Sequence, residues 1–187
     1  MNTIEIADAA ARLKSARRIM VIGCSGSGKS TLSRQLADRH GLPYISMDRE
    51  FFWLPGWQVR GKSEMEGLVA EAVKRPSWIM DGTSPRTMQA RLARAELVIW
   101  TRPPRWTSVR GIVKRRFRYA GRSRPDMAEG CPERLNWDFI RYVWTFEQKF
   151  APRVERMLDL HGGDIPVCVL KSYAENNELL ALSARDH

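Results

Sequence analysis

The sequence lacks several features that would place it in a specialised class of protein. No apolar run approaches the ~20 residues of a membrane-spanning helix, and residues 1–18 contain no continuous apolar stretch of signal-peptide length. We therefore expect a cytoplasmic protein with no membrane partner. Only three cysteines occur, Cys24, Cys131 and Cys168, and none belongs to a CxxC pair. The sequence thus favours neither a disulfide framework nor a zinc site.

Acidic residues are absent from one long stretch of the chain. Between Thr101 and Pro125 there are nine Arg or Lys residues and no Asp or Glu, in a chain whose net charge is +10. Such a block attracts polyanions, whether nucleotide triphosphates or a nucleic acid backbone. Charge alone does not separate these partners. Nucleic acid binding through residues 102–124 therefore stays open beside a small-molecule acceptor.

The length and pattern of the chain favour one α/β domain over residues 1–187. Of the 187 residues, 43% are hydrophobic, which is enough for a compact core. Short apolar runs alternate with helical patterns, as in a mostly parallel sheet with helices on both faces. We predict five strands, at residues 18–22, 43–47, 78–80, 96–101 and 166–170. We predict helices at residues 6–16, 29–40, 63–74, 85–95, 106–119, 137–160 and 174–184.

The segment GCSGSGKS, residues 23 to 30, follows the apolar run 19–22 and matches GxxxxGK[ST] in full. It falls between a predicted strand and a predicted helix, the context that a phosphate-binding P-loop requires. We expect Lys29 to reach the β- and γ-phosphates of ATP and the Ser30 hydroxyl to ligate Mg²⁺. The nucleotide-binding residues are predicted to be Gly23, Cys24, Ser25, Gly26, Ser27, Gly28, Lys29, Ser30 and Thr31.

A second acidic motif, WIMDG at residues 78 to 82, narrows the class of P-loop protein. An apolar strand that ends in Asp81 places a carboxylate beside the P-loop, where it can hold Mg²⁺ as a Walker B acid does. The alternative is an Asp that only caps the next helix. A signalling GTPase is disfavoured, because the sequence contains no NKxD motif and Asp81 does not begin a DxxG motif. We therefore favour a kinase that uses ATP and Mg²⁺.

The run DGTSPRTMQA, residues 81 to 90, resembles the DGFPRTxxQA segment of adenylate kinases, with one residue inserted before Pro85 and one missing before Gln89. In that family the Arg contacts the phosphate of the acceptor nucleotide and the Gln contacts its base. The resemblance implies that Arg86, and by the same alignment Gln89, lie on the acceptor side of the site.

A second resemblance covers most of the chain. Its segments are SMDREFFWLPGW (46–57), WIMDGT (78–83), the basic helix with Arg110, Arg115 and Arg116, and GRSRPDMAEG (121–130) with Trp144. They resemble DNA topology modulation proteins of the FlaR type, P-loop proteins that are similar to adenylate kinases. The resemblance implies a nucleoside-monophosphate-kinase-like fold with a lid, here at residues 115–135. The family name reports a cellular effect and does not fix a substrate.

Two residues near the second predicted strand are candidates for the acceptor side. Asp48 follows that strand and so lies on the edge of the sheet where α/β proteins bind ligands. It could orient the acceptor as a base, or it could be an ordinary loop carboxylate. Trp53 could stack against an acceptor, although aromatic residues near a loop more often pack in the core.

The arginines of the basic stretch are candidates for stabilising a phosphoryl group in transfer. Positive charge must accumulate on the equatorial oxygens as the γ-phosphoryl group moves, and a closing lid commonly supplies it. A solvated basic face is the alternative for any single arginine. We predict that the catalytic arginines are Arg110, Arg115, Arg122 and Arg124.

The sequence thus predicts ATP- and Mg²⁺-dependent phosphoryl transfer to a small acceptor, with a nucleotide or nucleoside favoured. One alternative is a nucleic-acid-binding P-loop protein in which nucleotide binding is regulatory, and another is a polynucleotide 5′-kinase. We find no helix-turn-helix, RRM or OB signature, and in the sequence the aromatic residues are not interleaved with the basic ones as in a stacking platform.

Overall fold

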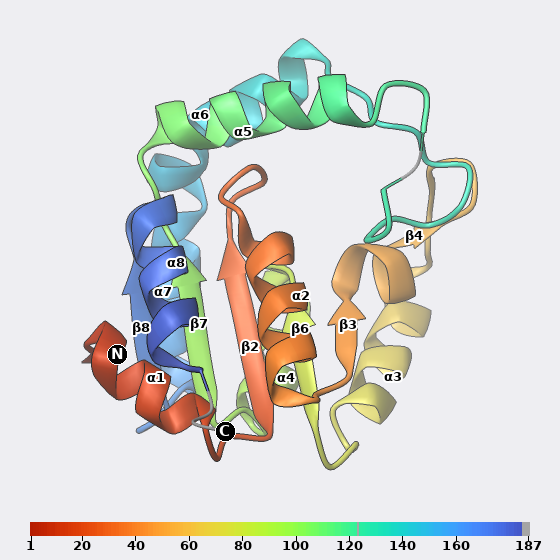
Figure 1. The fold of residues 1–187 in the computed structure, drawn as a ribbon. Helices are drawn as coiled ribbons and strands as arrows, with labels where there is room; N and C mark the ends of the chain where they lie inside the picture. Colours follow the sequence, from red (N-terminus) through yellow and green to blue (C-terminus); the bar gives the residue numbers. More distant parts are fainter. Residues whose placement is uncertain (123, 185–187) are drawn as a thin grey trace.

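A six-stranded parallel sheet forms the centre of the protein, in the computed structural model that describes residues 1–122 and 124–184 (Figure 1). The strand order is β1-β8-β7-β2-β6-β3. The strands are β1 (Asn2–Ile4), β2 (Arg18–Gly23), β3 (Tyr44–Ser46), β6 (Trp78–Asp81), β7 (Leu97–Thr101) and β8 (Pro166–Leu170). The predicted α/β class with a parallel sheet is confirmed. The sixth strand, β1, was not predicted, because three residues at a partly exposed edge carry no apolar run.

Helices cover both faces of the sheet, as the alternation of the sequence predicts. The helices are α1 (Ile6–Leu13), α2 (Lys29–His40), α3 (Lys62–Ala72), α4 (Pro85–Leu92), α5 (Arg105–Arg118), α6 (Trp137–Lys149), α7 (Ala151–His161) and α8 (Tyr173–Leu182). One apolar cluster joins the sheet to α1, α2 and α8, and the other joins it to α3, α4 and α7. Helices α5 and α6 lie across the carboxyl ends of the strands (Figure 1).

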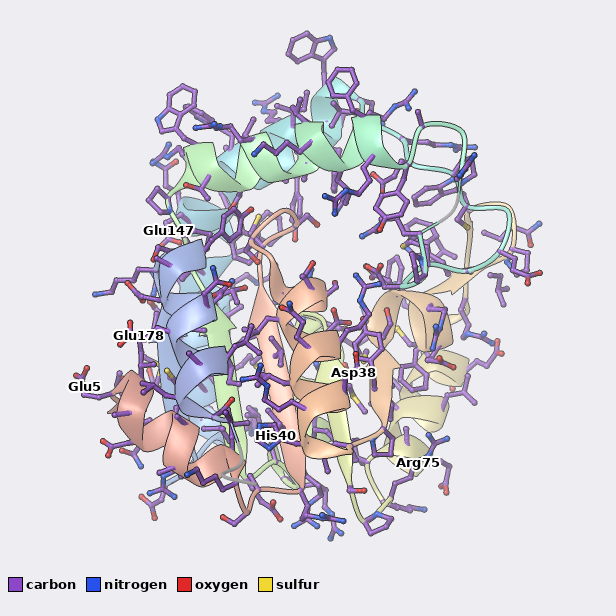
Figure 2. The ribbon with its side chains drawn as sticks, viewed as in Figure 1. Glu5, Asp38, His40, Arg75, Glu147 and Glu178 are labelled. Atoms are coloured by element: carbon purple, nitrogen blue, oxygen red, sulfur yellow. The ribbon has the colours of Figure 1, made fainter. Side chains whose placement is uncertain are left out.

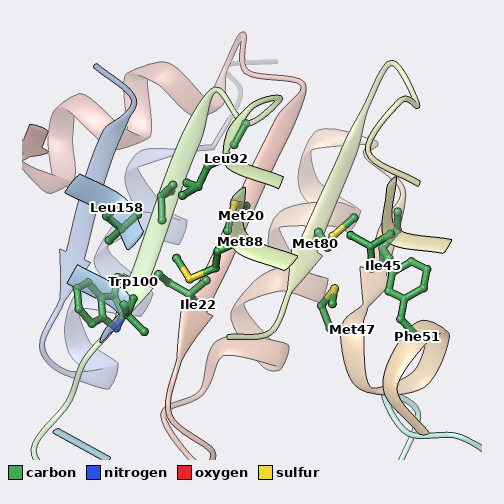
Figure 3. Close-up of a cluster of buried hydrophobic side chains, with 14 of the residues drawn as sticks. Met20, Ile22, Ile45, Met47, Phe51, Met80, Met88, Leu92, Trp100 and Leu158 are labelled. Carbon is green, nitrogen blue, oxygen red and sulfur yellow. The ribbon is translucent and has the colours of Figure 1, made fainter. Parts of the chain in front are cut away.

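The two apolar clusters follow from the alternation of side chains along buried strands. In β2, Ile19 and Val21 belong to the cluster under α1, α2 and α8. Met20 and Ile22 belong to the opposite cluster, which Figure 3 shows in close-up. All four side chains are fully buried. Because β2 is buried on both faces, it holds the start of the P-loop at the carboxyl edge of the sheet.

The long helix predicted at residues 137–160 is wrong in one respect, because it is two helices. Helix α6 ends at Lys149, and α7 begins at Ala151 with Pro152 in its first turn. A proline lacks the amide hydrogen that an uninterrupted helix needs, and its ring collides with the preceding turn. The break lets α6 lie beside α5 above the sheet while α7 packs against α4.

A small antiparallel hairpin, β4 (Trp53–Leu54) and β5 (Gln58–Val59), follows a short helical turn, η1 (Asp48–Phe52). The predicted lid, residues 115–135, comprises the end of α5 and the loop after it, and its Ser123 lies outside the described residues. The Glu129 carbonyl in this loop accepts a hydrogen bond from the Gly56 amide in the hairpin, at 3.4 Å. The loop and the hairpin are therefore in contact.

No helix in the described part of the chain is both long enough and apolar enough to cross a membrane.

The P-loop and α5 approach each other through two glycines. Gly26 has φ 82°, and a Cβ added there would collide with the Ser108 carbonyl oxygen of α5. Gly111 lies inside α5, where a Cβ would collide with the Gly26 carbonyl oxygen. Glycine normally weakens a helix interior by ~1 kcal/mol relative to alanine. Gly111 therefore permits a backbone contact that no larger residue allows.

This contact predicts that Gly111→Ala destabilises the protein, although alanine is the better helix former. We expect the free energy of unfolding to fall by ~1–2 kcal/mol through overpacking. The matched control is Gly67→Ala in α3, where no described atom outside the surrounding helix backbone lies within 4 Å of the added Cβ. That variant should gain ~0.5–1 kcal/mol. Urea denaturation of both variants tests the contact, and equal gains would show that α5 does not press on the P-loop.

Candidate functional site

The P-loop is fixed in place by contacts on several sides. Ser27 Oγ lies 2.6 Å from Thr101 Oγ1 at the end of β7, and the Tyr173 hydroxyl at the start of α8 donates to the Gly26 carbonyl at 2.6 Å. Gly28 adopts a left-handed conformation and precedes the first turn of α2. The amide groups at this helix start are free to face an anion. These contacts thus hold the loop in the shape of a phosphate cradle.

The loop after β6 is bonded directly to the P-loop. Thr83 Oγ1 accepts a hydrogen bond from the Gly23 amide at 2.7 Å and donates to the Gly23 carbonyl at 2.9 Å. The fully buried Arg91 donates to the carbonyls of Gly82, at 2.7 Å, and Ser84, at 2.9 Å. Arg91 therefore sets the path of this loop, and Thr83 joins it to the P-loop.

Asp81 lies at the end of β6 with 3% of its surface exposed. Burial raises the pKa of its carboxyl to about 6, while Lys29 and a hydrogen bond with Ser30 oppose that rise. Asp81 Oδ2 is buried and has no hydrogen-bond partner within the described residues. A buried, unpaired carboxylate oxygen beside a P-loop serine is the donor set that a hard divalent cation prefers. The residues present therefore fit Mg²⁺.

A cavity of about 350 Å³ opens between the P-loop, the inner face of α5, the lid loop and the start of α8. Six of its lining residues are basic, and one is acidic, Asp126. The basic residues are Lys29, Arg34, Lys114, Arg115, Arg118 and Arg124. Such a lining suits a ligand with several negative charges. Its place above the P-loop identifies it as the candidate site of a nucleotide triphosphate.

Two carboxylates of the lid loop hold the arginines of this cavity. Glu133 forms ion pairs with Arg115, at 3.1 Å, and with Arg124. Asp126 pairs with Arg124, at 2.9 Å, and with Arg34 of α2, at 3.6 Å. Burial acts to raise the pKa of Asp126, but the surrounding cations hold it below its usual value. The lid loop is therefore bound to the cavity wall through charges that a phosphate could also engage.

The structure brings together much of the predicted P-loop site. Five of its predicted residues border the cavity: Gly26, Gly28, Lys29, Ser30 and Thr31. Gly23, Cys24 and Ser27 are buried, and Ser25 is half-buried. Burial raises the pKa of the Cys24 thiol to about 12, so the side chain stays protonated. Cys24 therefore contributes backbone rather than thiolate chemistry.

The predicted arginines divide into two groups. Arg115 and Arg124 border the cavity. Arg110 and Arg122 are exposed and do not belong to its described lining. Residues 110 and 115 differ by five positions, which places them on different sides of a helix with 3.6 residues per turn. The expectation that all four arginines share one site is therefore not met in this structure.

The predicted acceptor-side residues lie apart from the cavity lining. Asp48 is half-buried at the start of η1 and contributes to the electrostatic environment of Asp81. Arg86 is exposed at the start of α4, with its guanidinium 3.5 Å from a Glu66 carboxylate oxygen. Gln89 is also exposed on α4. Asp48 is thus the acceptor-side candidate that acts electrostatically on Asp81.

Trp53 has a packing role in this structure. Trp53 and Trp57 pack against the lid cluster of Met127, Ala128 and Cys131, and the two tryptophan rings lie edge to face with centroids 4.9 Å apart. Trp53 thus packs in the manner that is more frequent for an aromatic residue near a loop, and its contact joins the hairpin to the lid loop.

Several residues of the site were not identified from the sequence. Arg34 lies four positions after Ser30, so helical periodicity alone could have placed it on the same face of α2. Tyr173 and Asn176 reach the cavity from α8, more than 140 positions after the P-loop. No local pattern signals such a contact. The ion pairs of Asp126 and Glu133 with arginines form because the lid loop folds back against α2 and α5. The sequence does not show this fold of the loop.

Comparisons with known proteins agree with this geometry. A family model described as "AAA domain" matches residues 19–120, more than half of the chain. Two curated relatives are shikimate kinases, from Paracidovorax citrulli (strain AAC00-1) at 46% identity over 52 residues and from Blochmanniella floridana at 42% over 53 residues. Each match covers 28% of this chain, and they cover 28% and 29% of the relatives. The chain thus matches less than a third of the length of these curated relatives.

Solved structures share the fold over almost the whole chain. The shikimate kinase from Acinetobacter baumannii in complex with shikimate superposes with a TM-score of 0.54 at 13% identity, over 92% of this chain and 94% of that one. A shikimate kinase from Bacteroides thetaiotaomicron gives a TM-score of 0.50 at 11% identity, over 89% and 95%. At this identity the likeness shows the fold alone. With its P-loop, its parallel sheet and the family match, the chain belongs to the AAA-domain family and has a P-loop kinase fold.

Proposed function

We propose that the protein is a kinase that transfers the γ-phosphoryl group of ATP to a small acceptor. The observation that carries this proposal is the buried Asp81 carboxylate, which lies beside Ser30 and has one oxygen without a hydrogen-bond partner among the described residues. Ser30 and Lys29 in turn border the basic cavity. A carboxylate in this position can hold the Mg²⁺ that phosphoryl transfer from ATP requires. The P-loop kinase fold supports the same conclusion.

The proposal assigns roles to the P-loop residues, to Asp81 and to two arginines of the lid side. Lys29 and the P-loop amides hold the β- and γ-phosphates, while Ser30 and Asp81 hold Mg²⁺. Bound Mg²⁺ would supply positive charge that offsets the charge of the phosphate oxygens. Arg115 and Arg124 contribute further positive charge from the lid side. The lid segment, residues 115–135, excludes water from the transferring group.

The acceptor in our proposal is a nucleoside or a nucleotide, with Asp48 as the group that orients its hydroxyl. Three arginines surround η1 and its neighbours, and each is paired with a carboxylate: Arg49 with Glu50, Arg60 with Glu64, and Arg86 with Glu66. A nucleotide acceptor would have to displace such a carboxylate with its own phosphate. Exposed ion pairs of this kind are weak, so a phosphate can displace the carboxylate, and both acceptors belong to the proposal.

The finer family resemblance, to the DNA topology modulation proteins of the FlaR type, remains part of this proposal. It supports an adenylate-kinase-like reaction with a lid. The shikimate kinase relatives, whose match covers only part of the chain, support a small-molecule acceptor. Both point to transfer onto a small molecule.

A screen of ADP release with ATP and Mg²⁺ tests the proposal. The acceptors would be nucleosides, nucleoside monophosphates, shikimate and 5′-hydroxyl oligonucleotides. We expect release to depend on a nucleoside or a nucleoside monophosphate. Release that depends only on the oligonucleotide would identify a polynucleotide 5′-kinase. Release with no acceptor dependence would contradict the proposal.

Replacement of Lys29 tests the donor site. We predict that Lys29→Ala abolishes ATP turnover, because it removes the cation that faces the β- and γ-phosphates. The melting temperature should change little, since the residue lies on the wall of an open cavity. The matched control is Lys74→Ala, which removes an exposed lysine in the turn after α3 and should leave turnover unchanged. Wild-type turnover in Lys29→Ala would contradict the donor site.

Replacement of Asp81 separates its metal role from a capping role. The raised pKa of Asp81 means that its ionised form destabilises the metal-free protein at pH 8, and that this cost disappears as the pH falls through 6 toward 4. We predict that Asp81→Asn raises the free energy of unfolding at pH 8 without Mg²⁺, by on the order of 2 kcal/mol, with little gain near pH 4. Turnover should fall by orders of magnitude, because an amide is a poorer Mg²⁺ ligand.

Urea denaturation at pH 4 and pH 8, together with Mg²⁺ titration of turnover, measures both effects. The control is Asp38→Asn, since Asp38 is exposed on α2, well below the carboxyl ends of the strands (Figure 2). An unchanged Mg²⁺ titration in Asp81→Asn would return Asp81 to a structural role.

A further inference from the structure

The outer surface of the α5–α6 layer exposes large aromatic side chains. Trp137 is 84% exposed, Phe117 is 79% exposed and Trp106 is 65% exposed. Figure 2 shows ring side chains projecting from this layer away from the sheet. Single exposed apolar residues are common, but three exposed aromatic rings on two neighbouring helices are typical of a binding surface.

The aromatic and basic residues alternate along one side of each helix. In α5, Trp106, Arg110 and Phe117 stand at positions i, i+4 and i+11, which fall within one narrow stripe at 3.6 residues per turn. In α6, Trp137, Arg141 and Trp144 repeat the order at i, i+4 and i+7. Arg110 and Arg141 are both exposed. Each helix thus places an arginine between aromatic residues.

The two stripes lie side by side because α5 and α6 pack against each other in opposite directions. The rings of Trp106 and Trp144 meet edge to face, with centroids 4.3 Å apart. Near the other ends of the helices, the Arg115 guanidinium lies 5.8 Å from the centroid of the Phe139 ring. This pairing places Phe117 and Trp137 at one end of the layer, with Trp106 and Trp144 at the other.

The charge of this surface is strongly positive. Residues 105–118 include six Arg or Lys and no Asp or Glu. In α6, Glu147 is paired with Arg102, which leaves Asp138 as an exposed acid in its first turn. The expectation that the aromatic residues are not interleaved with the basic ones is therefore wrong. The interleaving arises from helical periodicity and from the packing of two helices.

We propose that the outer surface of α5 and α6 binds single-stranded nucleic acid. Unpaired bases stack on aromatic rings whatever their sequence, and arginines between the rings meet the phosphates. A membrane-binding helix separates its apolar and basic residues onto opposite faces, whereas here they share one stripe. A second copy of the chain would bring two positively charged helices together. Single-stranded nucleic acid matches both the charge and the rings.

This surface is separate from the candidate nucleotide site. Lys114, Arg115 and Arg118 project from α5 into the cavity, whereas Trp106 and Phe117 are exposed outside it. The proposal therefore goes beyond the proposed kinase activity and does not depend on it. One preparation can show kinase activity without this binding, or this binding without kinase activity.

Fluorescence anisotropy with a fluorescein-labelled 15-mer of deoxythymidine tests the surface. For the triple variant Trp106→Ala, Phe117→Ala and Trp137→Ala we expect the affinity to fall at least tenfold, since each stacked base contributes ~1–3 kcal/mol. The dependence on salt should keep its slope. For Arg110→Ala with Arg141→Ala, the slope of log K against log salt should instead fall by up to about 1.4, ~0.7 per lost phosphate contact. Leu160→Ala, which removes an exposed apolar residue from α7, is the control and should bind as the wild type does.

Further measurements exclude other occupants. A hairpin duplex of equal charge should bind more weakly, because its bases are already stacked. Wild-type affinity in the triple variant, or equal binding of the duplex, would overturn the proposal. Binding to phosphatidylglycerol vesicles without binding to the 15-mer would identify a membrane surface instead. A dimer in light scattering that the triple variant abolishes, again without binding to the 15-mer, would identify a second copy as the occupant. Either of these two results would also overturn the proposal that the surface binds single-stranded nucleic acid.

Discussion

The backbone contact between Gly26 and Gly111 is the constraint on which the rest of the structure depends. It presses α5 onto the P-loop, so that one face of α5 closes the nucleotide cavity while the other faces solvent. Tyr173 adds a hydrogen bond to the same Gly26 carbonyl. A side chain at either glycine would force the loop and the helix apart. Both the candidate catalytic cavity and the outer surface of α5 and α6 follow from this one close approach.

Charge inside the cavity is balanced by the protein itself. Glu133 and Asp126 hold Arg115, Arg124 and Arg34 in the absence of a ligand. Without these carboxylates the cations would repel one another, and the ion pair between Asp126 and Arg34 that joins the lid loop to α2 would be lost. Phosphate oxygens can take the place of the carboxylates on the same arginines. Nucleotide binding and the position of the lid loop are therefore linked through shared partners.

Local patterns predict the sheet and the P-loop but not the contacts between distant segments. The sequence predicts the strand that leads to Asp81 and the phosphate cradle of the P-loop, because each depends on a few adjacent residues. Arg91, Tyr173 and Glu133 could not be placed, because their partners lie on other elements. The sequence predicts Arg110 as a catalytic arginine, because a basic stretch does not show which side of a helix each arginine occupies. The helical repeat places Arg110 and Arg115 on different sides of α5. Only the packing of α5 against the P-loop shows which side faces the cavity.

The most direct test of the central claim is the fate of the γ-phosphoryl group of ATP. The wild-type protein would be incubated with ATP labelled at the γ-phosphate, with Mg²⁺ and the acceptor that best stimulates ADP release. The label would then be followed by chromatography. The account predicts that labelled acceptor forms in a one-to-one ratio with ADP, with little inorganic phosphate. Label found only in inorganic phosphate, or retained in ATP with every acceptor, would contradict a kinase.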